Sequence, residues 1–150
     1  MSSFDILPLS ITTALDGTPA EVLAATMLHF GAQAGTVHGM ENGLLTLVTS
    51  ANIPPPIVDI IRQVPIGKGI AGLAAQRLEP VTLCNLQTDT SGQARPAAKA
   101  TGMEGSIAVP ILVGGELRGV LGIAKATAYE WPAAESALLL AIGAQLGARL

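Results

Sequence analysis

Residues 106–126 carry the clearest hydrophobic pattern of the chain. Two apolar segments, 106–113 and 116–126, are separated by Gly114-Gly115, a two-residue connection typical of a β-hairpin. Because both faces of these strands are apolar, the pattern predicts a sheet that is covered on both sides. The alternating sets are Ile107, Val109 and Ile111 with Ala108 and Leu112 on the first strand, and Leu117, Leu121 and Ile123 with Val120, Gly122 and Ala124 on the second.

A long helix is predicted near the start of the chain. Thr18 is a suitable N-cap, Pro19 fits the first helical position, and Glu21 at the third position completes a capping box. We expect this helix to run to about residue 33 and to be stopped by Gly35.

The rest of the pattern consists of short elements and a second long helix. Asn42-Gly43 is a strong hairpin signal, and Pro54-Pro55-Pro56 breaks the chain before a short helix. Residues 85–104 are small and polar, which predicts a long loop with one helical turn near 95–101. The other expected elements are helices over 4–15, 56–63, 69–77 and 131–149, and strands over 36–39, 44–49 and 81–84.

The order of these elements predicts an α+β fold. The hairpins favour an antiparallel sheet over a series of βαβ units. A chain of 150 residues fits one compact domain, and no repeat or linker divides it. We therefore expect a single domain over 1–150, in which residues 1–17 form a helical extension and residues 18–150 form the core.

Composition narrows the range of partners. Hydrophobic residues make up 49% of the chain and charged residues 13%, so some apolar surface is expected to remain for a partner or a second copy. The net charge is −3 and no run of Lys or Arg occurs, which argues against nucleic acid and anionic membranes as partners. No segment has the length of a membrane span or the pattern of a secretory signal, so we expect a cytoplasmic protein.

The ordered set of segments resembles a GAF domain over about residues 18–150. The resemblance rests on "VPIGKGIAGLAAQRLEPVTLCNL" at 64–86 and "SIAVPILVGGELRGVLGIA" at 106–124, between the first hairpin and the closing helix. It implies a central antiparallel sheet of five or six strands. The first and last long helices would cover one face, and the short helices and the long loop would roof a pocket on the other.

The same resemblance implies a regulatory role. GAF domains are typically sensory modules that bind small molecules, often dimerise through their terminal helices, and signal to a partner or to a fused output domain. No output domain is evident in this sequence. We therefore expect either that the chain signals through a homodimer or a separate signalling protein, or that it is a piece of a larger system. A dimerisation scaffold that binds no ligand is the alternative.

The glycine segment has the spacing Gly67-x-Gly69-x-x-Gly72, which formally matches a dinucleotide-binding turn. That mechanism needs a buried strand and a βαβ unit, and Pro65 and the following hairpin argue against both. Two interpretations stay open. The glycines permit a tight entry into a helix, or the helix start near Lys68, Gly69 and Ile70 holds a carboxylate or phosphate.

The long loop over 85–104 is either a solvated connection or a lid over the pocket, since loops of this length are often functional. As a lid, it would place Asn85 and Ser106 beside the pocket mouth. Arg95 or Lys99 would then meet an anionic ligand.

Cys84 is the only cysteine of the chain. We favour a small buried hydrophobe as its role, with a contact to the ligand as the alternative. The GAF branch that reduces free methionine-R-sulfoxide uses cysteines in the glycine segment and in the long loop. Ala71 stands at the first of these places and residues 92–96 contain no Cys. One thiol cannot resolve its own oxidised form, so we assign no catalytic residue and keep this reductase as the alternative.

No cofactor is identified. Aromatic residues make up 3% of the chain, too few for a cage around a planar cofactor such as haem. Bilin-binding GAF domains usually carry a Cys-His pair, and Asn85 follows Cys84 here. The characteristic residue set of cyclic-nucleotide GAF domains is also missing. His29 and His38 have no partner at metal-ligand spacing, so no metal site is predicted.

The C-terminal helix shows two stripes. Leu138, Leu139, Ile142 and Leu146 are expected to pack on the sheet or on the neighbouring helix. The second stripe consists of small residues and one leucine: Leu140, Gly143, Ala144 and Gly147. Because glycine costs a helix about 1 kcal/mol relative to alanine, this stripe predicts close approach of another helix. The approaching helix is either 19–33 of the same chain or a two-fold partner in a homodimer.

Overall fold

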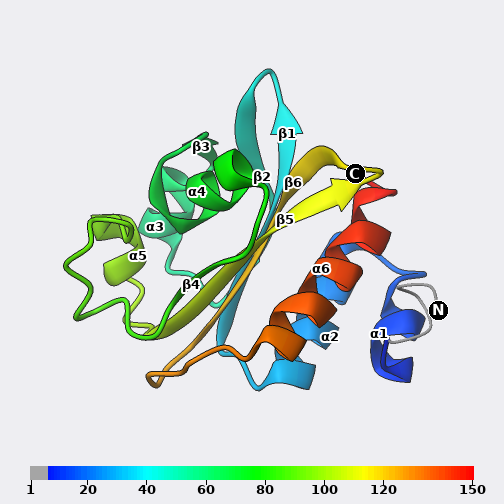
Figure 1. The fold of residues 1–150 in the computed structure, drawn as a ribbon, viewed down its shortest axis with the longest axis horizontal. Helices are drawn as coiled ribbons and strands as arrows, with labels where there is room; N and C mark the ends of the chain where they lie inside the picture. Colours follow the sequence, from blue (N-terminus) through cyan, green and yellow to red (C-terminus); the bar gives the residue numbers. More distant parts are fainter. Residues whose placement is uncertain (1–6) are drawn as a thin grey trace.

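A computed structural model describes residues 7–150 and contains one six-stranded antiparallel sheet with strand order β3-β2-β1-β6-β5-β4 (Figure 1). Phe4, the first residue of the predicted N-terminal helix, lies outside the described residues. The elements are α1 (Leu9–Ala14), α2 (Pro19–Phe30), β1 (Ala34–Glu41), β2 (Leu44–Ala51), α3 (Pro55–Ile60), β3 (Gln63–Pro65), α4 (Gly69–Arg77), β4 (Val81–Leu83), α5 (Pro96–Lys99), β5 (Gly105–Val113), β6 (Glu116–Lys125) and α6 (Ala133–Gly147).

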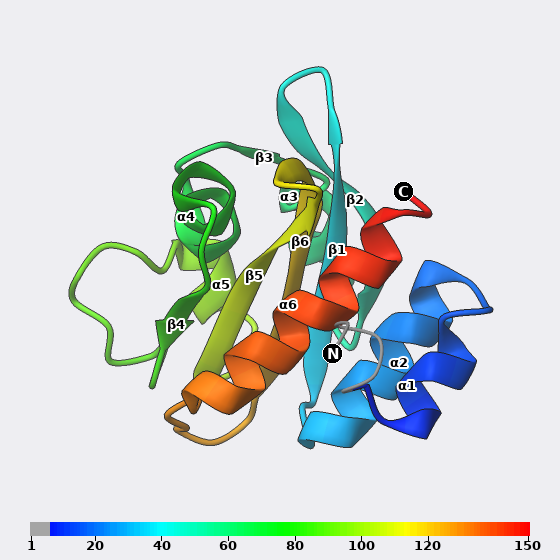
Figure 2. The same cartoon turned by 45° about the vertical axis from the view of Figure 1, so that its right-hand side comes forward.

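The helices divide between the two faces of the sheet. The long helices α2 and α6, with α1 beside α2, cover one face, whereas α3, α4 and α5 lie on the other (Figures 1 and 2). Two separate hydrophobic clusters fill the space between the sheet and these two layers. The predicted α+β fold, its sheet of five to six strands and its two helical layers are therefore confirmed.

The register of β1, β6 and β5 explains why the two faces differ. One cross-strand row, Val37–Leu121–Val109, turns large apolar side chains toward the long helices. The next row, on the opposite face, is Thr36–Gly122–Ala108, and the row after it on that face is Ala34–Ala124–Ser106. Because side chains alternate along a strand, the same three strands present a filled face and a face of small residues.

The local signals for the start of α2 are confirmed. The Thr18 hydroxyl accepts a hydrogen bond from the Glu21 backbone N–H at 3.2 Å, and the Glu21 carboxylate accepts one from the Thr18 N–H at 3.3 Å. The predicted end of this helix is wrong. It stops at Phe30, because Gly31 adopts the left-handed conformation with φ 67°, and Gly35 already lies within β1.

Both hairpin turns have the expected geometry. Asn42 and Gly43 have φ of 52° and 79°, and Gly114 and Gly115 have φ of 59° and 80°. Positive φ at both central positions suits the right-handed twist of the flanking strands. The sequence did not predict β3, a three-residue strand whose Pro65 is tolerated because β3 is an edge strand.

The glycines of α6 have a different neighbour from the one predicted. Gly143 and Gly147 are buried against β5: a Cβ on Gly147 would lie 2.6 Å from Ile111 Cγ2 and 2.7 Å from Val113 Cγ2. These glycines face a strand of their own chain, neither residues 19–33 nor a free surface. They are therefore unavailable for the predicted dimer stripe, of which Leu140 and Ala144 remain half-buried. The dimer itself stays a prediction.

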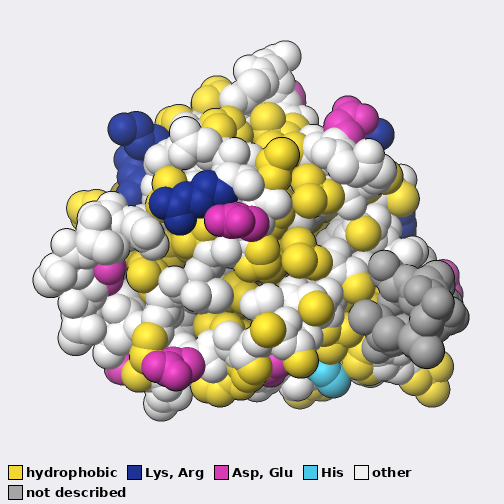
Figure 3. Space-filling view, viewed as in Figure 1, with side chains coloured by type: hydrophobic (Ala, Val, Ile, Leu, Met, Phe, Trp, Pro, Cys, Tyr) yellow, Lys and Arg dark blue, Asp and Glu magenta, His cyan; other side chains and the backbone are white. Residues whose placement is uncertain are grey.

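The surface keeps apolar side chains, as the composition predicted. Figure 3 shows scattered charged groups among hydrophobic patches, and large apolar residues such as Leu9 and Leu28 are more than four-fifths exposed. Within residues 7–150, every helix is too short or too polar to cross a lipid bilayer.

Alanine substitutions at the two glycines of α6 should change stability in opposite directions. At Gly143 the new Cβ would meet Ile111 Cγ1 at an ordinary 3.5 Å, so Gly143→Ala should raise the free energy of unfolding by up to about 1 kcal/mol through helix propensity. At Gly147 the overlap with Ile111 and Val113 should lower it by about 1–3 kcal/mol. Urea denaturation of both variants measures the difference, and equal effects would contradict the packing described here.

Candidate functional site

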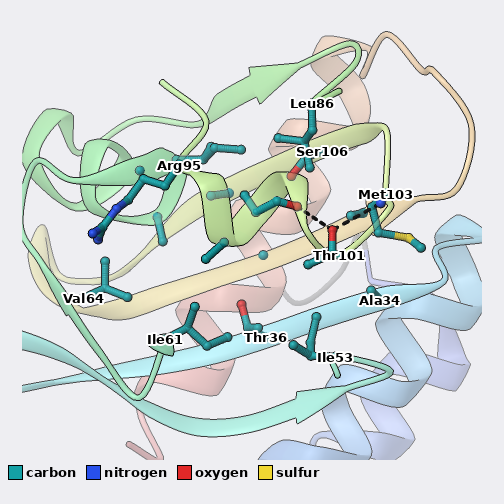
Figure 4. Close-up of a pocket in the computed structure, with 18 of the residues that line it drawn as sticks. Ala34, Thr36, Ile53, Ile61, Val64, Leu86, Arg95, Thr101, Met103 and Ser106 are labelled. Atoms are coloured by element: carbon teal, nitrogen blue, oxygen red, sulfur yellow. Dashed lines mark hydrogen bonds between the residues drawn. The ribbon is translucent and has the colours of Figure 1, made fainter. Parts of the chain in front are cut away.

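A cavity of about 160 Å³ lies between the small-residue face of the sheet and the short helices (Figure 4). The two small-residue rows of β1, β6 and β5 form its floor. Its roof comes from α3, α4 and the segment 86–103. The roof residues are Ile57 and Ile60 of α3, Ile53 and Ile61 beside it, Ile70 and Ala71 of α4, and Leu86, Ala97, Ala98, Thr101 and Met103 of the segment 86–103. Val64 of the edge strand β3 also lines the cavity.

His38 attaches α3 to the sheet at one end of the cavity. Its Nε2 donates a hydrogen bond to the Ile61 carbonyl at 2.9 Å, which fixes the tautomer with the proton on Nε2. The side chain is 2% exposed, and Nδ1 has no partner within residues 7–150. Burial lowers the pKa of His38, and the bond to Ile61 opposes this shift more weakly. Burial therefore favours the neutral form of the ring.

Residues 85–104 form a lid with its own hydrogen-bond network. Its two ends are joined where the Leu86 N–H donates to the Glu104 carbonyl at 2.8 Å. Inside the loop, Asp89 accepts bonds from Ser91 and from the Ala94 N–H. The hydrogen bond from the Ser91 hydroxyl is the main reason that the pKa of Asp89 is lowered. Hydrogen bonds within the segment therefore hold the shape of the lid.

Gln87 and Lys99 complete this network. Gln87 Nε2 donates to the carbonyls of Lys99 and Met103 at 2.9 and 2.8 Å. Lys99 Nζ donates to the Asp89 carbonyl at 2.9 Å. The sequence predicted that Arg95 or Lys99 would contact an anionic ligand. The ammonium group of Lys99 is instead bonded within the lid, whereas Arg95 lines the cavity.

The structure brings most of the predicted site residues together. The cavity is lined by Lys68, Gly69, Ile70, Arg95 and Ser106. Lys68 and Arg95 are exposed at its rim, while Ile70 is buried in the roof.

Two other candidates lie away from the cavity. Cys84 is exposed, so its predicted role as a small buried hydrophobe is wrong. The chain leaves the sheet after Leu83, and the side chain of Cys84 faces solvent. Asn85 does not line the cavity either. Its amide donates to the Glu104 carboxylate and its Oδ1 accepts from the Gln87 N–H. Asn85 therefore helps to join the two ends of the lid.

Apart from Ser106, sequence reasoning missed the floor of the cavity, and it also missed His38. The signal for the floor was present in the hairpin, where Ala108, Gly122 and Ala124 alternate with larger residues. The role of His38 depends on its contact with Ile61, which comes from the long-range placement of α3. Among residues 7–150, no cluster of His, Cys, Asp or Glu has the geometry of a metal site.

His38 should make stability depend on pH. An unfolded chain protonates this ring near its ordinary pKa of about 6.5, whereas the folded chain has a lower pKa. Its contribution is therefore complete above about pH 6.5 and falls with decreasing pH by up to about 1.4 kcal/mol per pH unit until the folded-state pKa is reached.

Urea denaturation at pH 7.5 and 5.5 tests this expectation. His38→Gln should lose less stability between the two pH values than the wild type. His29→Gln, which removes a solvent-exposed imidazole on α2, is the control and should keep the wild-type decline because it retains His38. Identical pH slopes for the wild type and His38→Gln would contradict the assignment.

Comparison with known families agrees with this architecture. A family model described as "GAF domain" matches residues 15–150. The chain belongs to the GAF family. No curated protein sequence matches the chain.

Solved structures, among them two GAF domains, are similar in fold. The GAF domain of a phosphoenolpyruvate-protein phosphotransferase from Coxiella burnetii has a TM-score of 0.79 and 22% identity over 99% of this chain and 92% of its own. The nlh2 GAF domain of A. aeolicus, in an inactive state, has a TM-score of 0.67 and 25% identity over 93% and 90%. Free methionine-R-sulfoxide reductase from Neisseria meningitidis, in complex with its substrate, has a TM-score of 0.76 and 17% identity over 98% and 87%.

Proposed function

We propose that this chain is a non-catalytic regulatory GAF module that binds a small molecule in the cavity under the 85–104 lid. The signal would pass to a second copy of the chain or to a separate partner protein. The observation that supports this most is the cavity itself: a hollow of about 160 Å³ with an aliphatic roof and a floor of small residues. A space of this size and character suits a small organic ligand.

Gln33 provides a physical link from the cavity toward the long helices. Its N–H donates to the Ala124 carbonyl at 2.9 Å, and its Oε1 accepts from the Ala126 N–H at 2.7 Å. Its own carbonyl accepts from Asn52 Nδ2 at 2.8 Å. Ala124 and Ile53, which follows Asn52, both line the cavity. A ligand that moves either wall would therefore act on the connection that follows α2.

A metabolite panel tests the proposal by thermal unfolding. A ligand at 100 times its Kd should stabilise the wild type by about 2.7 kcal/mol, which raises Tm by several degrees. Ala124→Leu fills the cavity from the floor and Ala98→Leu fills it from the roof, so both variants should lose the Tm rise. Ala133→Leu, an exposed substitution at the start of α6, is the matched control and should keep it.

Two results would count against ligand sensing. One is that no compound in the panel stabilises the wild type. The other is that the cavity-filling variants, folded by circular dichroism, respond as the wild type does. A dimer in light scattering together with either result would favour the alternative of a dimerisation scaffold.

Sulfoxide reduction is the competing function, and the similarity to the Neisseria meningitidis reductase is its support. Cys84, the only thiol, is exposed and does not line the cavity. It is therefore badly placed to attack a sulfoxide bound there, and no second thiol of the chain could resolve the product.

We expect no turnover of free methionine-R-sulfoxide with a dithiol reductant present. Wild type and Cys84→Ser should both give the background rate in a coupled assay. Activity in the wild type that disappears in Cys84→Ser would overturn the non-catalytic assignment.

A further inference from the structure

The charges around the cavity have one sign. Lys68 and Arg95 line it, and no Asp or Glu does so within residues 7–150. The chain as a whole carries a net charge of −3. The charge at the rim of the cavity is therefore opposite in sign to the net charge of the chain. A cavity with only cationic side chains at its edge attracts an anion.

Neither cation is occupied by a partner in the described part of the chain. The ion pairs found there join Arg62 to Asp59 and Arg118 to Glu116. No side-chain hydrogen bond from Lys68 or Arg95 is found among residues 7–150, in contrast to Lys99. Two unpaired cations beside an apolar hollow are available for a ligand.

The backbone of Lys68 and the side-chain stem of Arg95 both lie next to the first residue of α4. Lys68 directly precedes Gly69, and a Cβ on Gly69 would lie 3.1 Å from Arg95 Cδ. The Arg95 stem therefore lies against the start of the helix, which the absence of a side chain on Gly69 permits. The partial positive charge of the helix start adds to the same potential.

The interior of the cavity suits a ligand with an aliphatic body and one polar substituent. Isoleucines and alanines make up most of its wall, and a cavity of about 150 Å³ holds a molecule with about six carbons. Figure 4 shows Thr36 and Ser106 on opposite sides of the hollow with their hydroxyl oxygens turned toward it. Neither hydroxyl has a hydrogen-bond partner among the described residues, so each can bond to a hydroxyl or keto oxygen.

We propose that the cavity binds a small aliphatic carboxylic acid that carries a hydroxyl or keto group. The carboxylate lies at the rim between Lys68 and Arg95, and the aliphatic body lies over the floor of small residues. This inference rests on the proposed sensing function and names the ligand class of that site.

Calorimetric titration with 2-hydroxy-4-methylpentanoate tests the carboxylate, and 2-hydroxy-4-methylpentanamide is the uncharged match. The acid should bind the wild type at least about tenfold more tightly than the amide, because hydrogen bonds to charged groups are the stronger ones. Arg95→Gln and Lys68→Gln should each weaken binding of the acid by about tenfold. Arg77→Gln removes the same charge at the opposite, exposed end of α4 and should leave affinity unchanged.

The outcomes separate the ligand class from the sensing function. Equal binding of acid and amide, or full affinity in both Arg95→Gln and Lys68→Gln, overturns the carboxylate assignment. The sensing function survives that result if Ala124→Leu still abolishes binding. Absence of binding by the acid, while another metabolite gives a Tm rise that Ala124→Leu removes, also overturns the ligand class alone. If nothing binds and Ala124→Leu changes nothing, both proposals fail.

Discussion

The apolar character of both faces of β5 and β6 is the constraint on which the rest of the structure depends. A sheet with two apolar faces must be covered twice, and one set of long helices cannot do this. The chain therefore places α2 and α6 on one side, and uses α3, α4 and the 85–104 lid on the other. The candidate site exists because this second layer consists of short helices and a loop.

The two faces are covered unequally because their side chains differ in size. The row Val37–Leu121–Val109 is filled by the long helices, whereas the row Thr36–Gly122–Ala108 leaves space above it. Gly122, in the middle of this row, has no side chain, and a Cβ there would come within 3.3 Å of Thr36 Oγ1. A hollow between sheet and roof thus follows from the register of three strands.

Signals between neighbouring residues predicted most of the fold. The candidate site was predicted less completely, because it depends on contacts between residues that are distant in the sequence. The capping box at Thr18 and the turns at Asn42-Gly43 and Gly114-Gly115 depend on neighbours in sequence, so residue type alone identified them. The glycine spacing in α6 predicted close approach correctly but could not identify the partner. That partner is the β-branched pair Ile111 and Val113, which only the packing of α6 on β5 brings there.

Some of the predicted site residues were placed correctly and others were not. Lys68, Gly69 and Arg95 were found because glycine spacing and loop length are visible in the sequence. Cys84 was misjudged because residue type was given more weight than the alternation of side chains along the strand. The period-two alternation of the strand continues through this residue: Val81 is buried, Thr82 is exposed, and Cys84 lies on the same side as Thr82.

The unequal cover also distributes stability in a way that suits a binding site. Burying a Leu, Ile or Phe side chain contributes about 1.5–3 kcal/mol, and alanine contributes much less. The cluster under the long helices holds Phe30, Trp131 and many leucines and isoleucines, whereas the cluster on the cavity side is rich in alanine. Most of the hydrophobic stabilisation therefore comes from the helical face. The roof and lid can change position without opening the main core, because local opening costs least where few large apolar groups are buried.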